Sequence, residues 1–220
     1  MLLKELQQIL KSKDVYVFDF DGVLVDSVEI KTRAFATLFN RYGQDVVRKV
    51  VTHHLQNTGI NRFEKIRYYH EHYLGKALSE DEIGTRAEEF SRLVVKNVIE
   101  APEIPGATRF LDSCYGNKGC YVNSATPETE LQEIIIGRGW EHYFRGIYGS
   151  PVSKEENLLR LFNEHNVIAD SCVYFGDSSS DITAANSARM FFIGVNIQEH
   201  IVDSCGMNIA CRINNFEDLE

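Results

Sequence analysis

Two aspartates stand two positions apart at the end of an apolar run near the N-terminus. Residues 14–27 read D-V-Y-V-F-D-F-D-G-V-L-V-D-S, so a β-branched and aromatic run ends in Asp19, Phe20, Asp21 and Gly22. This pattern predicts a buried strand with two carboxylates on one face of its carboxyl end, followed by a sharp turn at the glycine. Neighbouring carboxylates repel each other strongly at low dielectric, so we expect a divalent cation there, and hard oxygen ligands suit Mg²⁺. The alternative is a solvated acidic turn, because short motifs give many false matches.

Further polar groups follow other predicted strands. Ser124 ends one apolar run just before a helix, whose free N–H groups would attract an anion. Lys154 stands near the start of the helix after the next strand, and Asp177 and Asp181 follow a later strand in G-D-S-S-S-D. Each has a simple alternative explanation as a helix cap, a surface lysine or helix-cap acids. Because open α/β sheets bind ligands at the carboxyl ends of their strands, the joint occurrence favours one shared site.

The elements that must position these groups alternate between strand and helix. An amphipathic helix is expected within the first 13 residues. Strands are predicted over residues 15–18, 119–124, 144–148, 171–176 and 190–195. Helices are predicted over residues 106–115, from 127, over 153–165 and over 179–188. The alternation is typical of an α/β fold, here a three-layer α/β/α Rossmann-like parallel sheet, followed by a weakly patterned tail.

A long helical insertion interrupts this alternation. Ser27 can cap its first helix, and Ser79 begins a capping box with Glu82 three residues on. The proline-rich segment 101–106 marks the return to the strand and helix pattern. We therefore predict two domains: a core of residues 1–26 and 101–220, and an inserted helical domain of residues 27–100.

Composition limits the classes of partner. A net charge of −9 over 220 residues gives no sign of a surface for nucleic acid or an anionic membrane. No stretch resembles a membrane span, and the N-terminus is too charged for a signal peptide. The cysteines form no C-x-x-C pair, so we interpret them as reduced thiols of a cytoplasmic protein, either a monomer or a homodimer. They are Cys114, Cys120, Cys172, Cys205 and Cys211.

Together the motifs resemble the haloacid dehalogenase-like superfamily over nearly the whole chain. The first motif of that superfamily, D-x-D-G-[TV]-[LV]-x-D-S, matches residues 19–27 without a gap. Ser124 matches the second motif, Lys154 the third, and residues 176–181 the G-D-x-x-x-D of the fourth. The helical insertion resembles the small cap of the phosphoglycolate phosphatase and β-phosphoglucomutase branch.

Three positions depart from the pattern. Ala125 stands where many relatives have asparagine, no proline follows Lys154, and Arg189 occupies a position that is commonly glycine, where a left-handed residue often closes a helix. These differences weaken assignment to one named enzyme more than they weaken the superfamily resemblance.

The resemblance implies phosphoryl transfer through an aspartyl-phosphate. Asp19 would be the nucleophile, and Asp21 would act first as general acid on the leaving oxygen and then as general base on water. The pKa of Asp21 is therefore expected nearer neutrality than that of Asp19. Mg²⁺ would be held by the Asp19 carboxylate, the Asp21 backbone carbonyl and Asp177, with Asp181 orienting this set.

The same resemblance assigns the phosphate-binding groups. Ser124 would donate to a phosphoryl oxygen, and Lys154 would offset the charge of both Asp19 and the phosphate. Gly22 and Ala125 are counted with these substrate-binding residues. An acid at position 21 would be needed to protonate an alkoxide leaving group, whereas a halide leaves without a proton. Asp21 therefore favours a phosphate ester over a carbon–halogen bond, and the expected substrate is a small phosphorylated molecule.

Substrate choice would come from the cap. The loop 57–62 carries Gly59 for a tight turn and Arg62, which could reach a second anionic group. A surface connection in which Asn61 caps a helix is an equal alternative. Phosphonatases of the superfamily use a cap lysine as a Schiff base, but Lys31, Lys49 and Lys65 are interpreted as solvated helix faces. None of the seven histidines is expected to be a metal ligand.

Three interpretations of function remain open. The first is a Mg²⁺-dependent phosphatase acting on a small phosphorylated metabolite. The second is a sugar phosphomutase of the β-phosphoglucomutase type, which would share every core residue. The third is a regulatory protein that uses the aspartate site as a phosphorylation switch, although receiver domains are smaller and lack both the insertion and the G-D-x-x-x-D element.

Overall fold

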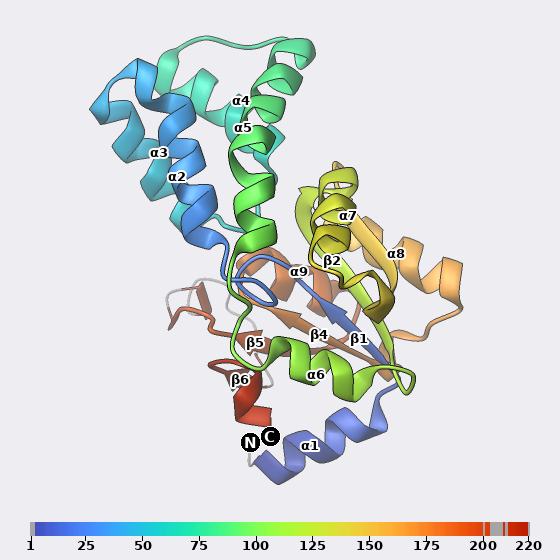
Figure 1. The fold of residues 1–220 in the computed structure, drawn as a ribbon. Helices are drawn as coiled ribbons and strands as arrows, with labels where there is room; N and C mark the ends of the chain where they lie inside the picture. Colours follow the sequence, from blue (N-terminus) through green and yellow to red (C-terminus); the bar gives the residue numbers. More distant parts are fainter. Residues whose placement is uncertain (1–2, 200, 203–208, 210, 220) are drawn as a thin grey trace.

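The computed structural model describes residues 3–199, 201–202, 209 and 211–219. Within these residues six strands form one sheet in the order β3-β2-β1-β4-β5-β6, and every pair is parallel (Figure 1). The strands are β1 (Val15–Phe18), β2 (Gly119–Pro127), β3 (Phe144–Ser150), β4 (Cys172–Gly176), β5 (Phe191–Val195) and β6 (Cys211–Ile213). This is a doubly wound order, in which the direction of winding reverses beside β1.

Helices cover both faces of the sheet. Strand β1 is buried along its whole length, and its side chains alternate between the two faces. Tyr16 and Phe18 pack with α1, α6 and α7, whereas Val15 and Val17 pack with α8 and α9. The bounds are α1 (Leu3–Ser12), α6 (Ala107–Cys114), α7 (Glu128–Gly137), α8 (Lys154–His165) and α9 (Ser179–Ser187). The predicted three-layer α/β/α Rossmann-like fold is confirmed.

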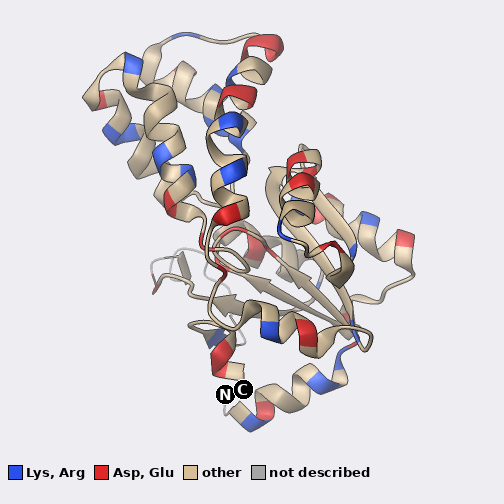
Figure 2. Cartoon of the chain, in the orientation of Figure 1, with Lys and Arg blue, Asp and Glu red and all other residues tan. Residues whose placement is uncertain are grey.

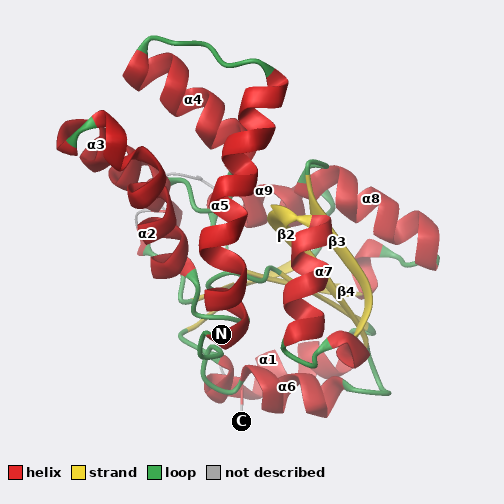
Figure 3. Cartoon of the chain, turned by 45° about the horizontal axis from the view of Figure 1, so that its top comes forward, coloured by secondary structure: helices red, strands yellow, loops and turns green. Residues whose placement is uncertain are grey.

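The segment after β1 forms a bundle of four helices. They are α2 (Val28–Phe39), α3 (Gln44–Gln56), α4 (Arg62–Leu74) and α5 (Glu80–Glu100), with a 3₁₀ turn over Asn40–Tyr42. Their shared core includes Phe35, Phe39, Tyr69 and Phe90. Figures 1 and 3 show this helical bundle standing clear of the sheet, on the side at which β1 ends. The exact division at residues 27 and 100 stays a prediction.

The two chain crossings between the sheet and the helical bundle lie side by side. The Asp26 N–H donates to the Pro102 carbonyl at 3.0 Å, and the Ile104 N–H donates to the Leu24 carbonyl at 3.0 Å. The predicted connecting segment 101–106 therefore pairs with the chain just after β1. A paired crossing of this kind keeps the base of the bundle next to the carboxyl end of β1.

The predictions for the helix ends agree with the structure at some positions and differ from it at others. Ser79 and Glu82 form the predicted capping box, and Arg189 adopts the left-handed conformation expected at its position, with φ 57°. Ser27 stands at the start of α2 but makes no side-chain cap, because its hydroxyl bonds to Asp21 instead. The helix expected from residue 127 begins one residue later, and Pro127 is both the last residue of β2 and the N-cap of α7.

The C-terminal tail holds structure that its weak pattern did not predict. Strand β6 pairs with β5, and a 3₁₀ helix over Phe216–Leu219 packs Phe216 against the aromatic side chains of the core. Three residues are too few to display an alternating pattern, so the sequence signal for this edge strand is weak.

No described helix is long and apolar enough to cross a membrane. Lysines and arginines are interspersed with aspartates and glutamates on the helical bundle (Figure 2). Among the described cysteines none forms a disulfide, and Cys205 lies outside the described residues.

Candidate active site

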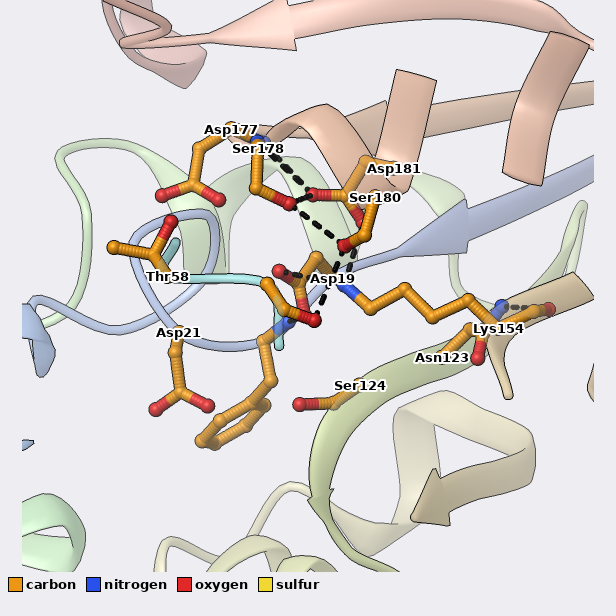
Figure 4. Close-up of polar contacts among 12 residues, drawn as sticks. Asp19, Asp21, Thr58, Asn123, Ser124, Lys154, Asp177, Ser178, Ser180 and Asp181 are labelled. Carbon is orange, nitrogen blue, oxygen red and sulfur yellow. Dashed lines mark hydrogen bonds and ion pairs between the residues drawn. The ribbon is translucent and has the colours of Figure 1, made fainter. Parts of the chain in front are cut away.

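The carboxyl ends of the central strands bring the predicted residues together. Asp19 follows β1, Ser124 lies near the end of β2, Lys154 begins the helix after β3, and Asp177 follows β4. Figure 4 shows the side chains of Asp21, Ser124, Lys154 and Asp177 arranged around Asp19. One pocket between the sheet and the helical bundle is lined by six of the predicted residues, namely Asp19, Asp21, Arg62, Ser124, Ala125 and Asp177.

Three carboxylates form the acidic part of the site. Oxygens of Asp19, Asp177 and Asp181 lie within 4.8 Å of one another. Asp181 is fully buried and accepts hydrogen bonds from Ser178 N at 3.1 Å and from the Tyr174 hydroxyl at 3.0 Å. The Asp177 carboxylate has no hydrogen-bond or ion-pair partner among the described residues. Burial, together with the charges of Asp19 and Asp181, raises the pKa of Asp177 well above its usual range.

Lys154 is the only cation within ion-pair distance of this acidic group among the described residues. Its Nζ lies 2.6 Å from Asp181 Oδ1 and 3.1 Å from Asp19 Oδ2. Burial alone would lower the pKa of Lys154, but the two carboxylates outweigh that effect and raise it, so the side chain stays charged. One lysine against three carboxylates leaves an excess of negative charge. Because all the ligand atoms are hard oxygens, the donor set fits Mg²⁺.

Asp19 is held in a fixed orientation. The Phe20 N–H donates to Asp19 Oδ1 at 2.7 Å, and the side chain is almost completely buried. The pKa of Asp19 is raised to about 7, mainly by burial. The Lys154 charge opposes this rise, whereas the charges of Asp181 and Asp21 add to it. A cation bound between Asp19 and Asp177 would stabilise both charged forms and lower these pKa values.

Asp21 has partners of its own, away from the acidic group. Its carboxylate accepts hydrogen bonds from the Ser27 hydroxyl at 2.6 Å and the Thr126 hydroxyl at 2.8 Å, and it forms an ion pair with Lys31. Burial would raise the pKa of Asp21, but Lys31 and these hydrogen bonds outweigh burial and lower it. The expectation that the pKa of Asp21 lies nearer neutrality than that of Asp19 is wrong for this arrangement, because the cation from α2 stabilises the Asp21 charge.

Gly22 is required for two physical reasons. Its φ of +82° lies in the left-handed region, and a Cβ at this position would collide with Asp177 Oδ2. The turn after β1 can therefore pass directly beside the carboxylate that follows β4. The glycine allows the first and fourth motifs to approach each other closely.

The loop between α3 and α4 closes over the pocket. Thr58 and Ile60 line the pocket, and the Ser180 hydroxyl donates to the Gly59 carbonyl at 3.3 Å. Asn61 caps α4, since its side chain accepts a hydrogen bond from Glu64 N at 3.0 Å. The loop is therefore both a helix cap and a wall of the site.

Arg62 does not extend from this loop as a free cation. It is 4% exposed and forms a two-pronged ion pair with Glu130 of α7, with Nη1 lying 2.6 Å from Oε2. Its charge is neutralised by this pair, so the expectation that Arg62 reaches a second anionic group on a substrate is not supported. The pair instead links the helical bundle to the helix that follows β2.

Two lysines were wrongly interpreted from the sequence. Lys31 and Lys65 both line the pocket, and Lys65 is 2% exposed, so neither is a solvated helix face. The buried residues of α4 include Arg62, Lys65, Ile66 and Tyr69. Their spacing of three, four and seven positions is that of one buried helix face, and this periodicity could have identified Lys65. Lys49 is exposed, as expected.

His54 and Thr126 are pocket residues that the motif analysis did not select. Thr126 lies two positions after Ser124, on the strand that was already predicted to reach the site. His54 follows His53 in a helix, and only its burial distinguishes it from its neighbour.

Comparison with known proteins places the fold and motifs in a family. The family model of haloacid dehalogenase-like hydrolases matches residues 16–195. A phosphoglycolate phosphatase of Colwellia psychrerythraea is 23% identical over 195 residues, covering 84% of this chain and 85% of that protein. A phosphorylated carbohydrates phosphatase of Thermotoga maritima is 26% identical over 180 residues, covering 80% of this chain and 81% of that protein.

Solved structures agree with this placement. A β-phosphoglucomutase of Clostridium difficile superposes with a TM-score of 0.76 at 24% identity, covering 94% of this chain and 93% of that chain. The resemblance inferred from the motifs is confirmed, and a receiver-type regulatory switch is not supported. From residue 16 to residue 195, the chain belongs to the haloacid dehalogenase-like hydrolases.

Proposed function

We propose that the protein is a Mg²⁺-dependent phosphatase that hydrolyses a small phosphate monoester through an aspartyl-phosphate on Asp19. The observation that carries the proposal is the position of the Asp19 carboxylate, which lies beside Asp177 and 3.1 Å from Lys154 and lines the pocket between the sheet and the helical bundle. Relatives named as phosphatases and as a 5'-nucleotidase support the same class of reaction.

In the first half-reaction the Asp19 carboxylate attacks phosphorus, and the bond between phosphorus and the leaving oxygen breaks. Because Lys31 lowers the pKa of Asp21, the carboxylate must first take up a proton from solvent. The protonated Asp21 then delivers this proton to the leaving oxygen, which leaves as an alcohol. In the second half-reaction Asp21 takes a proton from water, the water oxygen attacks phosphorus, and the bond to Asp19 breaks. Inorganic phosphate leaves, Asp19 is again a carboxylate, and Asp21 is again protonated.

Other residues stabilise charge around this reaction. Ser124 donates to a phosphoryl oxygen, and Lys154 offsets the charge of Asp19 and of the phosphate. Asp181 orients Lys154 through the contact of 2.6 Å. Mg²⁺ would be held by Asp19, the backbone carbonyl of Asp21 and Asp177, and it would supply charge neutralisation at the phosphoryl oxygens.

The presence of Asp21 distinguishes this reaction from dehalogenation. A halide leaves without a proton, whereas an alkoxide needs one, and Asp21 is the acid available beside Asp19. A phosphomutase would use the same residues, and it remains the alternative proposal. Addition of a sugar 1-phosphate separates the two, since a mutase gives the isomeric sugar phosphate and a phosphatase gives free phosphate.

The test is phosphate release from p-nitrophenyl phosphate in the presence of Mg²⁺. We expect turnover that EDTA abolishes and that Asp19→Asn abolishes while the fold persists by circular dichroism. Asp170→Asn is the matched control, because Asp170 is fully exposed and precedes the opposite end of β4. An Asp19→Asn variant that retained half of the activity would remove Asp19 from the role of nucleophile.

A further inference from the structure

Polar side chains of the helical bundle form part of the pocket wall. Lys31 of α2, His54 of α3 and Lys65 of α4 all line the same pocket as Asp19 and Asp21. Phe35, Ile60 and Phe90 form its apolar part. The leaving group of a phosphate ester bound at Asp19 would extend into this space, so these side chains determine which leaving group fits.

Three cations line this pocket, and two of them are already compensated. Lys31 forms an ion pair with Asp21, and Arg62 forms one with Glu130. Lys65 has no carboxylate within ion-pair distance anywhere in the described chain. Its partners are His54 Nδ1 at 2.9 Å and the Thr58 carbonyl at 3.5 Å, with the ring of Phe35 at 5.7 Å.

A buried ammonium with neutral partners alone carries a large desolvation cost. Burial, together with repulsion from Lys31, lowers the pKa of Lys65 to about 7. An anion bound beside Lys65 would supply the missing counter-charge. On the side of the helical bundle, the pocket therefore holds one cation that has no counter-charge among the described residues.

His54 holds Lys65 in position through a hydrogen bond. Burial and the neighbouring lysines lower the pKa of His54 to about 2, so its ring is neutral. Its Nδ1 accepts the hydrogen bond from Lys65, which puts the ring proton on Nε2. This buried Nε2 has no hydrogen-bond partner among the described residues. Because the two ring nitrogens face opposite sides of the ring, this proton points away from Lys65, and His54 contributes to the site by holding Lys65 through Nδ1.

We propose, on the basis of the phosphatase function above, that this wall binds a carboxylate on the leaving group of the substrate. Lys65 offers donors and no acceptor, and the acceptor nitrogen of His54 is already used by Lys65. This suits carboxylate oxygens better than sugar hydroxyls, since a hydroxyl also has a proton to donate. A single uncompensated cation suits a monoanion better than a second phosphate dianion. The substrates are thus short phosphate esters of hydroxy acids.

The experiment compares esters that differ only in the second anion. Phosphoglycolate carries a carboxylate where ethyl phosphate carries a methyl group. Ethylene glycol bisphosphate carries a second phosphate in place of the carboxylate. We expect kcat/KM to be at least tenfold higher for phosphoglycolate than for either analogue. A charge-assisted contact contributes roughly ten- to hundredfold in binding, which sets this expectation.

Variants at position 65 test whether Lys65 causes the preference for phosphoglycolate over ethyl phosphate. Lys65→Met should lower kcat/KM for phosphoglycolate at least tenfold more than for ethyl phosphate, mainly through KM, and Lys65→Arg should restore part of the difference. Lys49→Met is the matched control, because Lys49 is an exposed lysine of the same helical bundle that does not line this pocket, and its substrate ratio should be unchanged. A role of Lys65 in folding alone would lower both activities equally and would contradict the proposal.

The outcomes separate this inference from the function on which it depends. If wild-type protein hydrolyses ethyl phosphate as well as phosphoglycolate, the carboxylate site is refuted and the phosphatase function stands. A preference for the bisphosphate also refutes it. If no ester releases phosphate with Mg²⁺, the phosphatase proposal fails, and the carboxylate site fails with it. The wild-type ratio gives this answer even if Lys65→Met does not fold.

Discussion

The hydroxyl of Ser180 donates a hydrogen bond to the carbonyl of Gly59, 3.3 Å away, and this contact joins the loop between α3 and α4 to the first turn of α9. A Cβ at Gly59 would overlap the hydroxyl oxygens of both Ser180 and Ser178. The glycine is therefore what allows the loop to close against the acidic side of the pocket.

Gly59→Ala should weaken this closure and lower kcat/KM for any phosphate ester about tenfold, because a small misplacement of a closing loop is costly to catalysis. The thermal unfolding midpoint should change little, since the loop contributes few core contacts. Gly84→Ala in α5 is the control, because a Cβ there meets no atom within 4 Å. Equal activity of the two variants would show that the contact does not matter.

The buried pair between Arg62 and Glu130 predicts a large effect on stability. Glu130→Gln would leave the Arg62 charge buried without a counter-charge, and we expect a loss of roughly 3–5 kcal/mol in the free energy of unfolding by urea. The exposed pair of Glu29 and Arg33 offers a comparison, and Glu29→Gln should change stability by less than about 1 kcal/mol. Similar losses in the two variants would mean that the Arg62 pair adds nothing beyond a surface pair.

The substrate preference should depend on pH through Lys65. Its pKa of about 7 means that the free enzyme holds the ammonium below pH 7 and loses it above. Because kcat/KM reports ionisation of the free enzyme, the ratio of kcat/KM for phosphoglycolate to that for ethyl phosphate should fall as pH rises through about 7. The ratio cancels the titration of Asp19 and Asp21, which both esters share. A ratio that is flat from pH 6 to 9 would contradict this assignment.

Lys65 should also reduce the stability of the fold. Its pKa is lower in the folded state than its ordinary value of 10.5, so the unfolded chain binds more protons between about pH 7 and 10. Stability therefore rises with pH across that window, and the cost of the buried charge is fully present below pH 7. Lys65→Met should raise the free energy of unfolding at pH 6 by ~0.5–2 kcal/mol, a typical exchange of stability for function. Destabilisation by more than about 1 kcal/mol in urea would show that Lys65 is needed for packing.

Much of the fold and the centre of the site could be predicted from the sequence. Parallel strands bring their carboxyl ends to one edge, so motifs far apart in the chain, such as Asp19 and Asp177, converge whenever each follows a strand. The same topology explains why Ser124 and Lys154 were found correctly near Asp19. The alternation of strands and helices predicts where these residues lie, whereas their selection and roles came from the resemblance of the motifs to the superfamily.

The cap side of the pocket could not be predicted in the same way. Charged residues such as Lys65 are exposed in most helices, so its place on the apolar face of α4 was the one local sign of its burial. Its position in the pocket depends on how α4 packs against the other helices of the bundle. The role of Ser27 was missed because a hydroxyl before a helix usually caps that helix, whereas here Asp21 is a stronger acceptor at 2.6 Å. The hydrogen-bond partner of such a side chain is determined by the tertiary structure, which a local sequence pattern does not show.

The most direct test of the central claim is chemical trapping of the phosphorylated residue. Protein mixed with excess substrate and Mg²⁺ is quenched in acid, reduced with borohydride, and digested for peptide mass spectrometry. An aspartyl-phosphate is reduced to homoserine, and we predict homoserine at position 19 only when substrate is present. Absence of this change in active protein, or its appearance at Asp21 or Asp177 instead, would contradict the account.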